Sequence, residues 1–97
     1  MRFRFTPRAE SEVDREQAWW REHRPKAPDL FDEELEQAIE QIVRRPTAGA
    51  IYPCGFPEVV RRVLLTKTKN YVYFTVNEGE IVILSVWGAP RRRGPKL

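Results

Sequence analysis

The chain has 97 residues and a net charge of +3 at pH 7, from 17 Lys and Arg against 14 Asp and Glu. This length accommodates one domain and excludes a large enzyme with a separate cofactor-binding domain. A hydrophobic fraction of 41% supports a packed core and excludes a disordered chain. We therefore expect a single domain over residues 1–97.

No segment has the features of a membrane span or a signal peptide. The longest apolar run, Ile81 to Trp87, is far shorter than the roughly 20 residues that a spanning helix needs. Met1 to Phe5 alternates basic and aromatic residues, whereas a signal peptide continues into an apolar segment. Cys54 has no second cysteine to pair with, which agrees with a reducing compartment. We expect a cytoplasmic protein that does not contact membranes.

The charges divide unevenly along the chain. Residues 1–45 carry 9 basic and 11 acidic side chains, whereas residues 46–97 carry 8 basic and 3 acidic ones. The first part thus has a balance of −2 and the second a balance of +5. This division suits a protein with two partners of opposite charge, and equally a soluble protein whose helices hold the carboxylates.

The first elements in chain order are a short strand and a helix. Arg2 to Phe5 alternates basic and aromatic residues with the period of a strand. Thr6 is a preferred N-cap residue and Pro7 is tolerated at the first helical position, so a helix is predicted to begin here. Its buried stripe comprises Ala9, Val13 and Trp20, widened by Trp19. The prolines in Arg24 to Pro28 end the helix.

A second helix is predicted from Asp29, a candidate N-cap, to about Arg45. Its apolar residues recur with helical spacing, and acidic residues occupy the opposite face. The apolar stripe comprises Phe31, Leu35, Ala38, Ile39, Ile42 and Val43. Pro46 stops the helix, and the short connection to the first helix predicts an antiparallel helical hairpin.

Three predicted strands follow a loop over residues 47–58 that is rich in Gly and Pro. They are Val59 to Leu65, Tyr71 to Val76 and Ile81 to Trp87, the last being a buried central strand. Turn residues at Lys67 to Asn70 and Asn77 to Glu80 connect them as antiparallel neighbours. The predicted fold class is therefore α+β: a small antiparallel β-sheet packed by a helical hairpin, in the order β-α-α-β-β-β.

Metal or nucleophilic chemistry has little support in the sequence. The only histidine, His23, falls at the predicted exposed end of the first helix, and Cys54 stands alone in the Pro/Gly loop. No His, Cys, Asp or Glu residues have the spacing of metal ligands, and the glycines do not form a phosphate-binding loop. We expect no metal and no cofactor, and the residues by themselves assign no catalytic group.

Basic and aromatic residues of the second half form the candidate binding surface. Arg61 and Arg62 are neighbours on one predicted strand, so their side chains face opposite sides of it. Cations interleaved with aromatic rings suit the phosphates and unstacked bases of RNA or DNA. The candidates for binding a target or a nucleic acid are Arg61, Arg62, Lys67, Lys69, Tyr73, Trp87, Arg91, Arg92 and Arg93.

A structural interpretation competes with this one. Tyr71, Tyr73 and Trp87 would fill a second small core, and Arg91 to Arg93 would form a frayed tail. We favour the core role for the aromatic residues and the binding role for Arg61 and the terminal arginines.

The sequence resembles the RelE/ParE superfamily of type II toxin–antitoxin toxins over nearly its whole length. The resemblance depends on the order and spacing of several short motifs. In chain order these are Phe5–Ala9, Trp19–Trp20, Ala38–Ile42 followed by Arg45–Pro46, Val60–Val63, Tyr71–Phe74 and Val86–Arg91. The resemblance implies a toxin whose sheet and helical hairpin are wrapped by a cognate antitoxin. The antitoxin also binds operator DNA, so the toxin would contact that DNA only indirectly.

Members of this superfamily divide by target. RelE-like toxins cleave mRNA in the ribosomal A site with clustered Lys, Arg and Tyr side chains, whereas ParE-like toxins lack the full catalytic set and inhibit DNA gyrase. By position and type, the residues that match ribonuclease roles are Arg61, Lys67, Lys69, Tyr71 and Arg91. The resemblance thus leaves two targets, DNA gyrase and the ribosome with its mRNA.

Two features favour the gyrase inhibitor. The four residues after Arg93 include no Tyr or His that would act as an acid or base. The indole of Trp87 does not transfer a proton near neutral pH. We therefore expect ParE-like growth arrest, with a ribosome-dependent mRNA endoribonuclease and a non-toxic relative that binds a nucleic acid or a partner as alternatives. An acidic antitoxin segment would cover the basic surface, so we expect the complex to weaken as salt rises.

Overall fold

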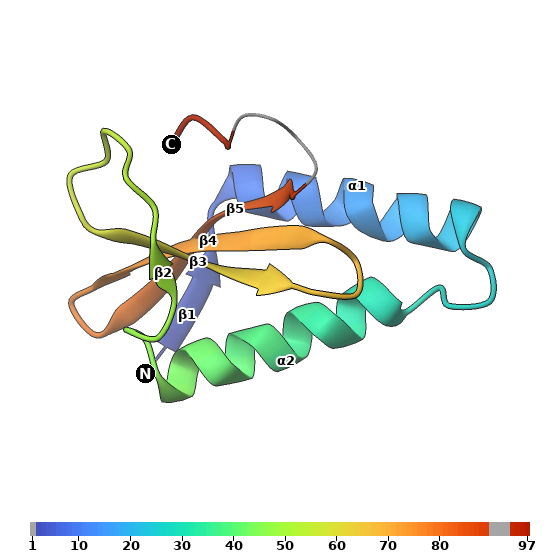
Figure 1. Cartoon of the computed structure of the whole chain (residues 1–97), viewed down its shortest axis with the longest axis horizontal. Coiled ribbons are helices and arrows are strands. Elements are labelled where there is room, and N and C mark those ends of the chain that lie inside the picture. The colour runs from blue at the N-terminus through green and yellow to red at the C-terminus, as the bar shows by residue number, and fades with distance from the viewer. Residues whose placement is uncertain (1, 90–93) are drawn as a thin grey trace.

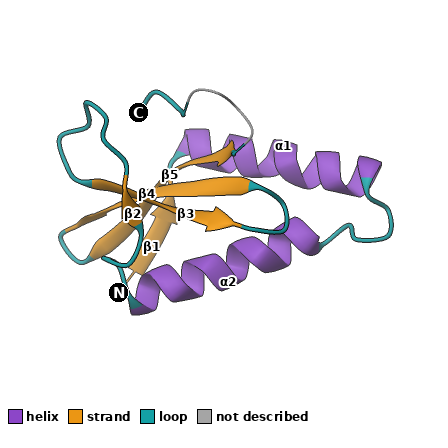
Figure 2. Ribbon diagram, in the orientation of Figure 1, coloured by secondary structure: helices purple, strands orange, loops and turns teal. Residues whose placement is uncertain are grey.

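The computed structural model describes residues 2–89 and 94–97 (Figure 1). The elements are β1 (Arg2–Phe5), α1 (Pro7–His23), α2 (Leu30–Arg44), β2 (Ala50–Ile51), β3 (Val60–Leu65), β4 (Asn70–Asn77) and β5 (Glu80–Gly88). Both helices pack on one face of a single sheet (Figure 2). No helix within the described residues is long and apolar enough to cross a membrane.

The sheet is mixed, with the strand order β1-β5-β4-β3-β2. The three predicted strands of the second half pair in antiparallel fashion, as expected, but β1 pairs parallel to β5 with Phe3 opposite Ile81. The expectation of a purely antiparallel sheet is therefore corrected. The reason is that the chain crosses over through both helices before it returns, and such a crossover connection permits parallel pairing. The two-residue β2, in the predicted loop, adds a fifth strand.

Helix α1 begins and ends as predicted. The Thr6 hydroxyl accepts a 3.1 Å hydrogen bond from the Ala9 amide, and Pro7 occupies the first turn. The expected contribution of Trp19 to the buried stripe is wrong, because its side chain is 42% exposed while Trp20 is buried. Successive helical residues are about 100° apart around the axis, so only one of the two indoles can face the core.

Helix α2 buries the predicted apolar stripe. Phe31, Leu35, Ile39 and Ile42 are all buried against the sheet and α1. Asp29 caps the helix through its backbone, because its carbonyl accepts from the Glu33 amide and its side chain makes no cap bond. Figure 1 shows α2 returning antiparallel to α1, as the short connection predicted.

The two predicted turns position the strands of the second half. Glu78 and Gly79 both have positive φ, 49° and 76°, as a tight hairpin turn of the primed type requires. Lys69, with φ of 61°, ends the turn between β3 and β4. These turns fix the register that pairs Tyr71 with Trp87.

The sheet face opposite the helices carries a second, smaller core. Its buried members are Val60, Tyr73, Val82 and Leu84, with Tyr52, Phe56, Tyr71, Trp87 and Leu97 packed against them. This confirms the expected core role of Tyr71, Tyr73 and Trp87. The tail returns to this face, because Pro95 is buried and its carbonyl oxygen lies 3.4 Å from the Tyr52 hydroxyl that donates to it.

Candidate functional site

Arg62 lies among three tyrosines on the sheet face opposite the helices. Its guanidinium lies 4.1 Å from the Tyr71 ring centroid and 5.4 Å from that of Tyr52, and it donates a 3.4 Å hydrogen bond to the Tyr73 hydroxyl. We call these four residues the arginine–tyrosine cluster. Within the described residues, no carboxylate lies within ion-pair distance of Arg62.

The cluster shifts the ionisation of two of its members. The hydrogen bond with Tyr73 raises the pKa of Arg62, although burial opposes the shift. Burial raises the pKa of Tyr73, and the interaction with Arg62 counteracts only part of that effect. Tyr73 therefore keeps its proton well beyond neutral pH and does not act as a base there.

Arg61 lies on the other face of β3. It pairs across the sheet with Phe74, a member of the helix-side core, and its guanidinium donates a 2.8 Å hydrogen bond to the Gly49 carbonyl. The prediction that Arg61 and Arg62 face opposite sides is confirmed. The two arginines consequently do not form one surface.

Lys67 and Lys69 lie on the turn between β3 and β4, and both side chains are exposed. The Glu34 carboxylate of α2 holds this turn by accepting hydrogen bonds from the Lys67 amide at 2.7 Å and from the Thr68 amide and hydroxyl at 3.0 and 2.7 Å. No local pattern predicts this anchor, because Glu34 lies 33 residues from Lys67 along the chain.

The candidate residues therefore lie at several separate sites and do not form one surface. Tyr73 and Tyr71 join Arg62, with Trp87 beside Tyr71 across the sheet. Tyr73 is 1% exposed, so its ring is not available to a base or a target surface. Arg91, Arg92 and Arg93 lie outside the described residues. The sequence did not predict two residues that contact these candidates. Tyr52 lies against Arg62 and Arg8 lies against Trp87, and both come from distant parts of the chain.

Arg8 connects α1 to the tail and to Trp87. Its guanidinium lies 5.7 Å from the Trp87 ring centroid, pairs with Glu12 at 3.5 Å and donates to the Lys96 carbonyl. These contacts tie the start of α1 to Trp87, which pairs with Tyr71 across the sheet.

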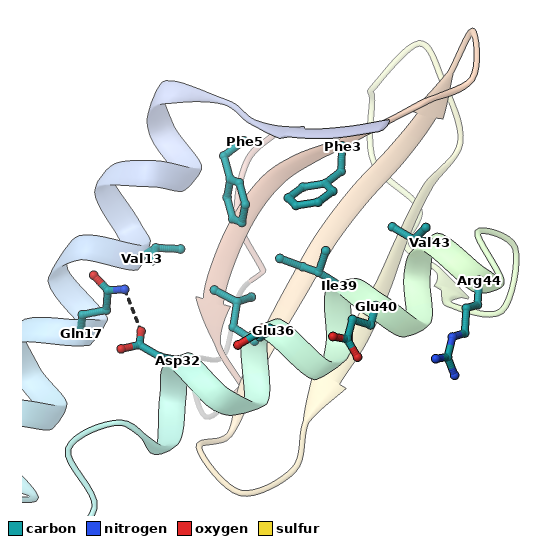
Figure 3. Close-up of a pocket in the computed structure, with 11 residues that line it drawn as sticks. Phe3, Phe5, Val13, Gln17, Asp32, Glu36, Ile39, Glu40, Val43 and Arg44 are labelled. Atoms are coloured by element: carbon teal, nitrogen blue, oxygen red, sulfur yellow. Dashed lines mark hydrogen bonds between the residues drawn. The ribbon is translucent and has the colours of Figure 1, made fainter. Parts of the chain in front are cut away.

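A groove of about 710 Å³ lies between α1, α2 and β1 (Figure 3). Its floor is apolar and consists of Phe3, Phe5, Val13, Leu35, Ile39 and Val43. Polar residues form the rim: Gln17, Asp32, Glu36, Glu40 and Arg44. Phe3 remains 48% exposed, and Gln17 donates a 2.7 Å hydrogen bond to Asp32 at one end of the groove. Such a groove suits an amphipathic helix or peptide.

Within residues 2–89 and 94–97, no group of three or more His, Cys, Asp or Glu side chains is arranged to hold a metal ion. His23 stacks on Trp19 with ring centroids 4.7 Å apart, and Cys54 is exposed.

Comparison with known proteins decides the family. The sequence model described as "ParE toxin of type II toxin-antitoxin system, parDE" matches residues 3–92, nearly the whole chain. The chain belongs to the ParE toxin family. This confirms the RelE/ParE resemblance and assigns the protein to the toxins of type II toxin–antitoxin systems.

Solved structures share the fold of this ParE-family toxin. A chain titled "Chromosomal ParDE TA system from P. aeruginosa" superposes with a TM-score of 0.71 at 20% identity, covering 91% of this chain and 95% of that one. The isolated E. coli RelE toxin gives 0.61 at 19% identity, with coverages of 95% and 87%. The E. coli RelBE toxin–antitoxin complex gives a TM-score of 0.61 at 20% sequence identity, covering 93% of this chain and 98% of that one. No curated protein matches in sequence.

Proposed function

We propose that this toxin arrests growth by inhibiting DNA gyrase and that a cognate antitoxin neutralises it. The observation that supports the proposal is the separation of Arg61 from Tyr71 and Lys67, three of the residues that match ribonuclease roles. Arg61 and Tyr71 belong to opposite faces of the sheet, and Arg61 is bonded to Gly49. Lys67 lies in the turn beyond Leu65, the end of β3, and Leu65 is itself roughly 13 Å from Arg61 at about 3.3 Å per residue. Phosphodiester cleavage needs such groups converging on one reacting centre.

Proton transfer is also poorly supported for the ribonuclease alternative. Tyr71, the tyrosine that matches a ribonuclease role, has its ring centroid 4.1 Å from the Arg62 guanidinium. Its neighbour Tyr73 supplies no base either, because its raised pKa keeps the phenol protonated near neutral pH and its hydroxyl is engaged with Arg62. A base that removes a 2′-hydroxyl proton works best with a pKa near the operating pH. Membership of the ParE family points in the same direction.

The target is tested with the purified toxin in two parallel assays. We expect loss of DNA supercoiling by gyrase and accumulation of cleaved DNA, both relieved when antitoxin is added. We expect no cleavage of mRNA on translating ribosomes, measured by primer extension. Ribosome-dependent cleavage without an effect on gyrase would assign the endoribonuclease instead. If expression without the antitoxin leaves growth unaffected, the protein is a non-toxic relative.

The groove of Figure 3 is the proposed seat of the antitoxin. An apolar floor with Phe3 half-exposed suits the apolar face of an amphipathic segment. The rim carries three carboxylates, from Asp32, Glu36 and Glu40, and one cation, Arg44. Asp32 is already paired with Arg21 at 3.6 Å, which leaves Glu36 and Glu40 as the carboxylates without an ion pair among the described residues. The segment in the groove should therefore carry Lys or Arg beside its apolar residues. Acidic residues elsewhere in the antitoxin would then contact the basic second half of the toxin. Such contacts between opposite charges agree with a complex that weakens as salt rises.

The antitoxin, and not the toxin, would contact operator DNA in this arrangement. The solved P. aeruginosa ParDE and E. coli RelBE neighbours are titled as toxin–antitoxin assemblies, which supports a cognate protein partner here. Gyrase inhibition also requires the cytoplasm, where this enzyme acts on chromosomal DNA.

A further inference from the structure

A second hollow of about 550 Å³ lies at the end of the molecule where α1 finishes. The last turns of α1, the turn between β3 and β4, and the end of β5 enclose it. Three cationic side chains line it: Arg24, Lys67 and Lys69. We call it the tip hollow. It shares no lining residue with the groove between α1, α2 and β1.

The acidic groups near the tip hollow are already hydrogen-bonded. Glu16, in its lining, accepts 3.2 Å hydrogen bonds from Trp20 Nε1 and Asn70 Nδ2. Glu34, behind the turn, accepts from the turn amides. Within residues 2–89 and 94–97, no carboxylate lies within ion-pair distance of Arg24, Lys67 or Lys69. The three cations therefore surround one concave space without an ion-pair partner, and they outnumber Glu16, the carboxylate in its lining.

Trp19 holds one of these cations at the rim. The Arg24 guanidinium lies 5.4 Å from the Trp19 ring centroid, and His23 stacks on the same indole with an interplanar angle of 13°. Cation–π contact of this kind orients a guanidinium while leaving its N–H donors available. It also explains why an exposed tryptophan occupies the polar end of α1.

We propose that the tip hollow binds the phosphate groups of a nucleic-acid strand through Arg24, Lys67 and Lys69, with Trp19 as a positioning residue for Arg24. Cations without ion-pair partners around a concavity match the spaced phosphates of a backbone. This proposal goes beyond gyrase inhibition, since strand binding is measurable without gyrase. It also allows the antitoxin to occupy the groove at the same time.

The test is fluorescence anisotropy of the full chain with labelled single-stranded DNA, duplex DNA and single-stranded RNA across a salt series. The key variant is Arg24→Gln/Lys67→Gln/Lys69→Asn, in which Asn suits the positive φ of position 69. The matched control, Arg2→Gln/Arg45→Gln/Lys96→Gln, removes the same charge from exposed residues outside the tip hollow. Circular dichroism checks that both variants fold. The variant Lys67→Arg/Lys69→Arg keeps the positive charges of the turn and should bind as tightly as the unsubstituted protein.

For three neutralised phosphates, the logarithm of affinity should fall with the logarithm of salt with a slope of about −2 on single strands and about −2.7 on duplex DNA. The key variant should lose about tenfold or more in affinity and most of this slope, while the control should stay within about twofold of the unsubstituted protein. The preferred strand then identifies the nucleic acid.

Equal binding by the key variant and the control would overturn the proposal, as would absence of binding at low salt. Equally tight binding of polyglutamate through the same three cations would assign an acidic protein partner instead. Gyrase inhibition, measured on the same variants, separates the two proposals, because inhibition without strand binding would overturn only this one.

Discussion

The Ser85 hydroxyl in β5 donates a 2.7 Å hydrogen bond to Oε1 of Glu12 in α1. The same oxygen accepts from the Val86 amide at 3.1 Å. Glu12 is only 8% exposed, and it meets β5 where the pairing with β4 changes register between Tyr73 and Phe74. A helical carboxylate thus satisfies the backbone at an irregularity of the sheet, and it ties α1 to the sheet by a polar contact within the core.

We expect Glu12→Ala to lower the free energy of unfolding by about 2 kcal/mol, because it leaves the Val86 amide and the Ser85 hydroxyl buried without an acceptor. Urea denaturation measures this as a lower midpoint with an unchanged slope. Asp14→Ala, at an exposed position of the same helix, should change stability by less than about 0.5 kcal/mol. Equal effects of the two substitutions would contradict a stabilising role for Glu12.

The groove should depend on Phe3 for antitoxin binding. Phe3→Ala removes an exposed ring from the groove wall, so we expect the affinity for the cognate antitoxin to fall about tenfold or more while stability changes little. Isothermal titration calorimetry gives the affinity. The matched control is Ile51→Ala, which also truncates an exposed apolar side chain, 59% accessible, but outside the groove. An antitoxin that binds both variants alike does not use this groove.

Alkaline pH should weaken the fold through Tyr73. Burial raises its pKa in the folded state, whereas in the unfolded chain it titrates near the ordinary tyrosine value of about 10. The folded state consequently holds its proton more tightly, so this contribution to stability is complete below about pH 10 and is lost as pH rises toward the folded-state pKa.

Unfolding experiments at several alkaline pH values measure the decline. Tyr73→Phe should make it shallower, because the substitution removes the titrating phenol. Tyr52→Phe leaves the Tyr73 phenol and its burial in place and should keep most of the decline, because Tyr52 is only a minor cause of the raised pKa of Tyr73. A Tyr73→Phe variant with an unaltered pH dependence would show that other groups cause the loss.

We expect Arg91 to Arg93 to affect toxicity, and residues 94–97 to affect the stability of the fold. Truncation after Arg93 removes Leu97 from the second core and the Pro95 carbonyl from Tyr52, so we expect a loss of about 1–2 kcal/mol. Replacing Arg91 to Arg93 with Gln should instead reduce toxicity in a growth assay and leave the melting temperature nearly unchanged. If the Gln variant fails to fold, the arginines are structural.

Local patterns predicted the helices, the three long strands and the two turns. The apolar spacing of α2 and the Thr6 cap depend on residues within a few positions, and such information is contained in a short window. The parallel pairing of β1 with β5 joins residues nearly 80 positions apart, and β2 exists only because β3 offers it an edge. The packing of Pro95 and Leu97 on the sheet likewise depends on distant partners.

The candidate site was predicted only in part, for the same reason. Strand alternation separated Arg61 from Arg62 and brought Tyr71 and Tyr73 onto one face. The third ring beside Arg62, that of Tyr52, comes from a loop with no regular pattern. The sequence pattern marks Arg24 only as part of the helix stop. Its position beside Lys67 and Lys69 depends on how α1 packs against the sheet, which no local pattern contains.

The open groove also affects the dynamics of α2. The apolar contacts of this helix come mainly from one row of side chains, Phe31, Leu35, Ile39 and Ile42, of which Leu35 and Ile39 also line the groove. Asp32 and Glu34 add polar contacts near its first turns, so its second half depends most on that row. Elements with few apolar contacts open first in local unfolding. In the isolated toxin, the amide hydrogens of α2 should therefore exchange with solvent faster than those of β4 and β5. Antitoxin binding should slow the hydrogen exchange of the α2 amides more than that of any other described element.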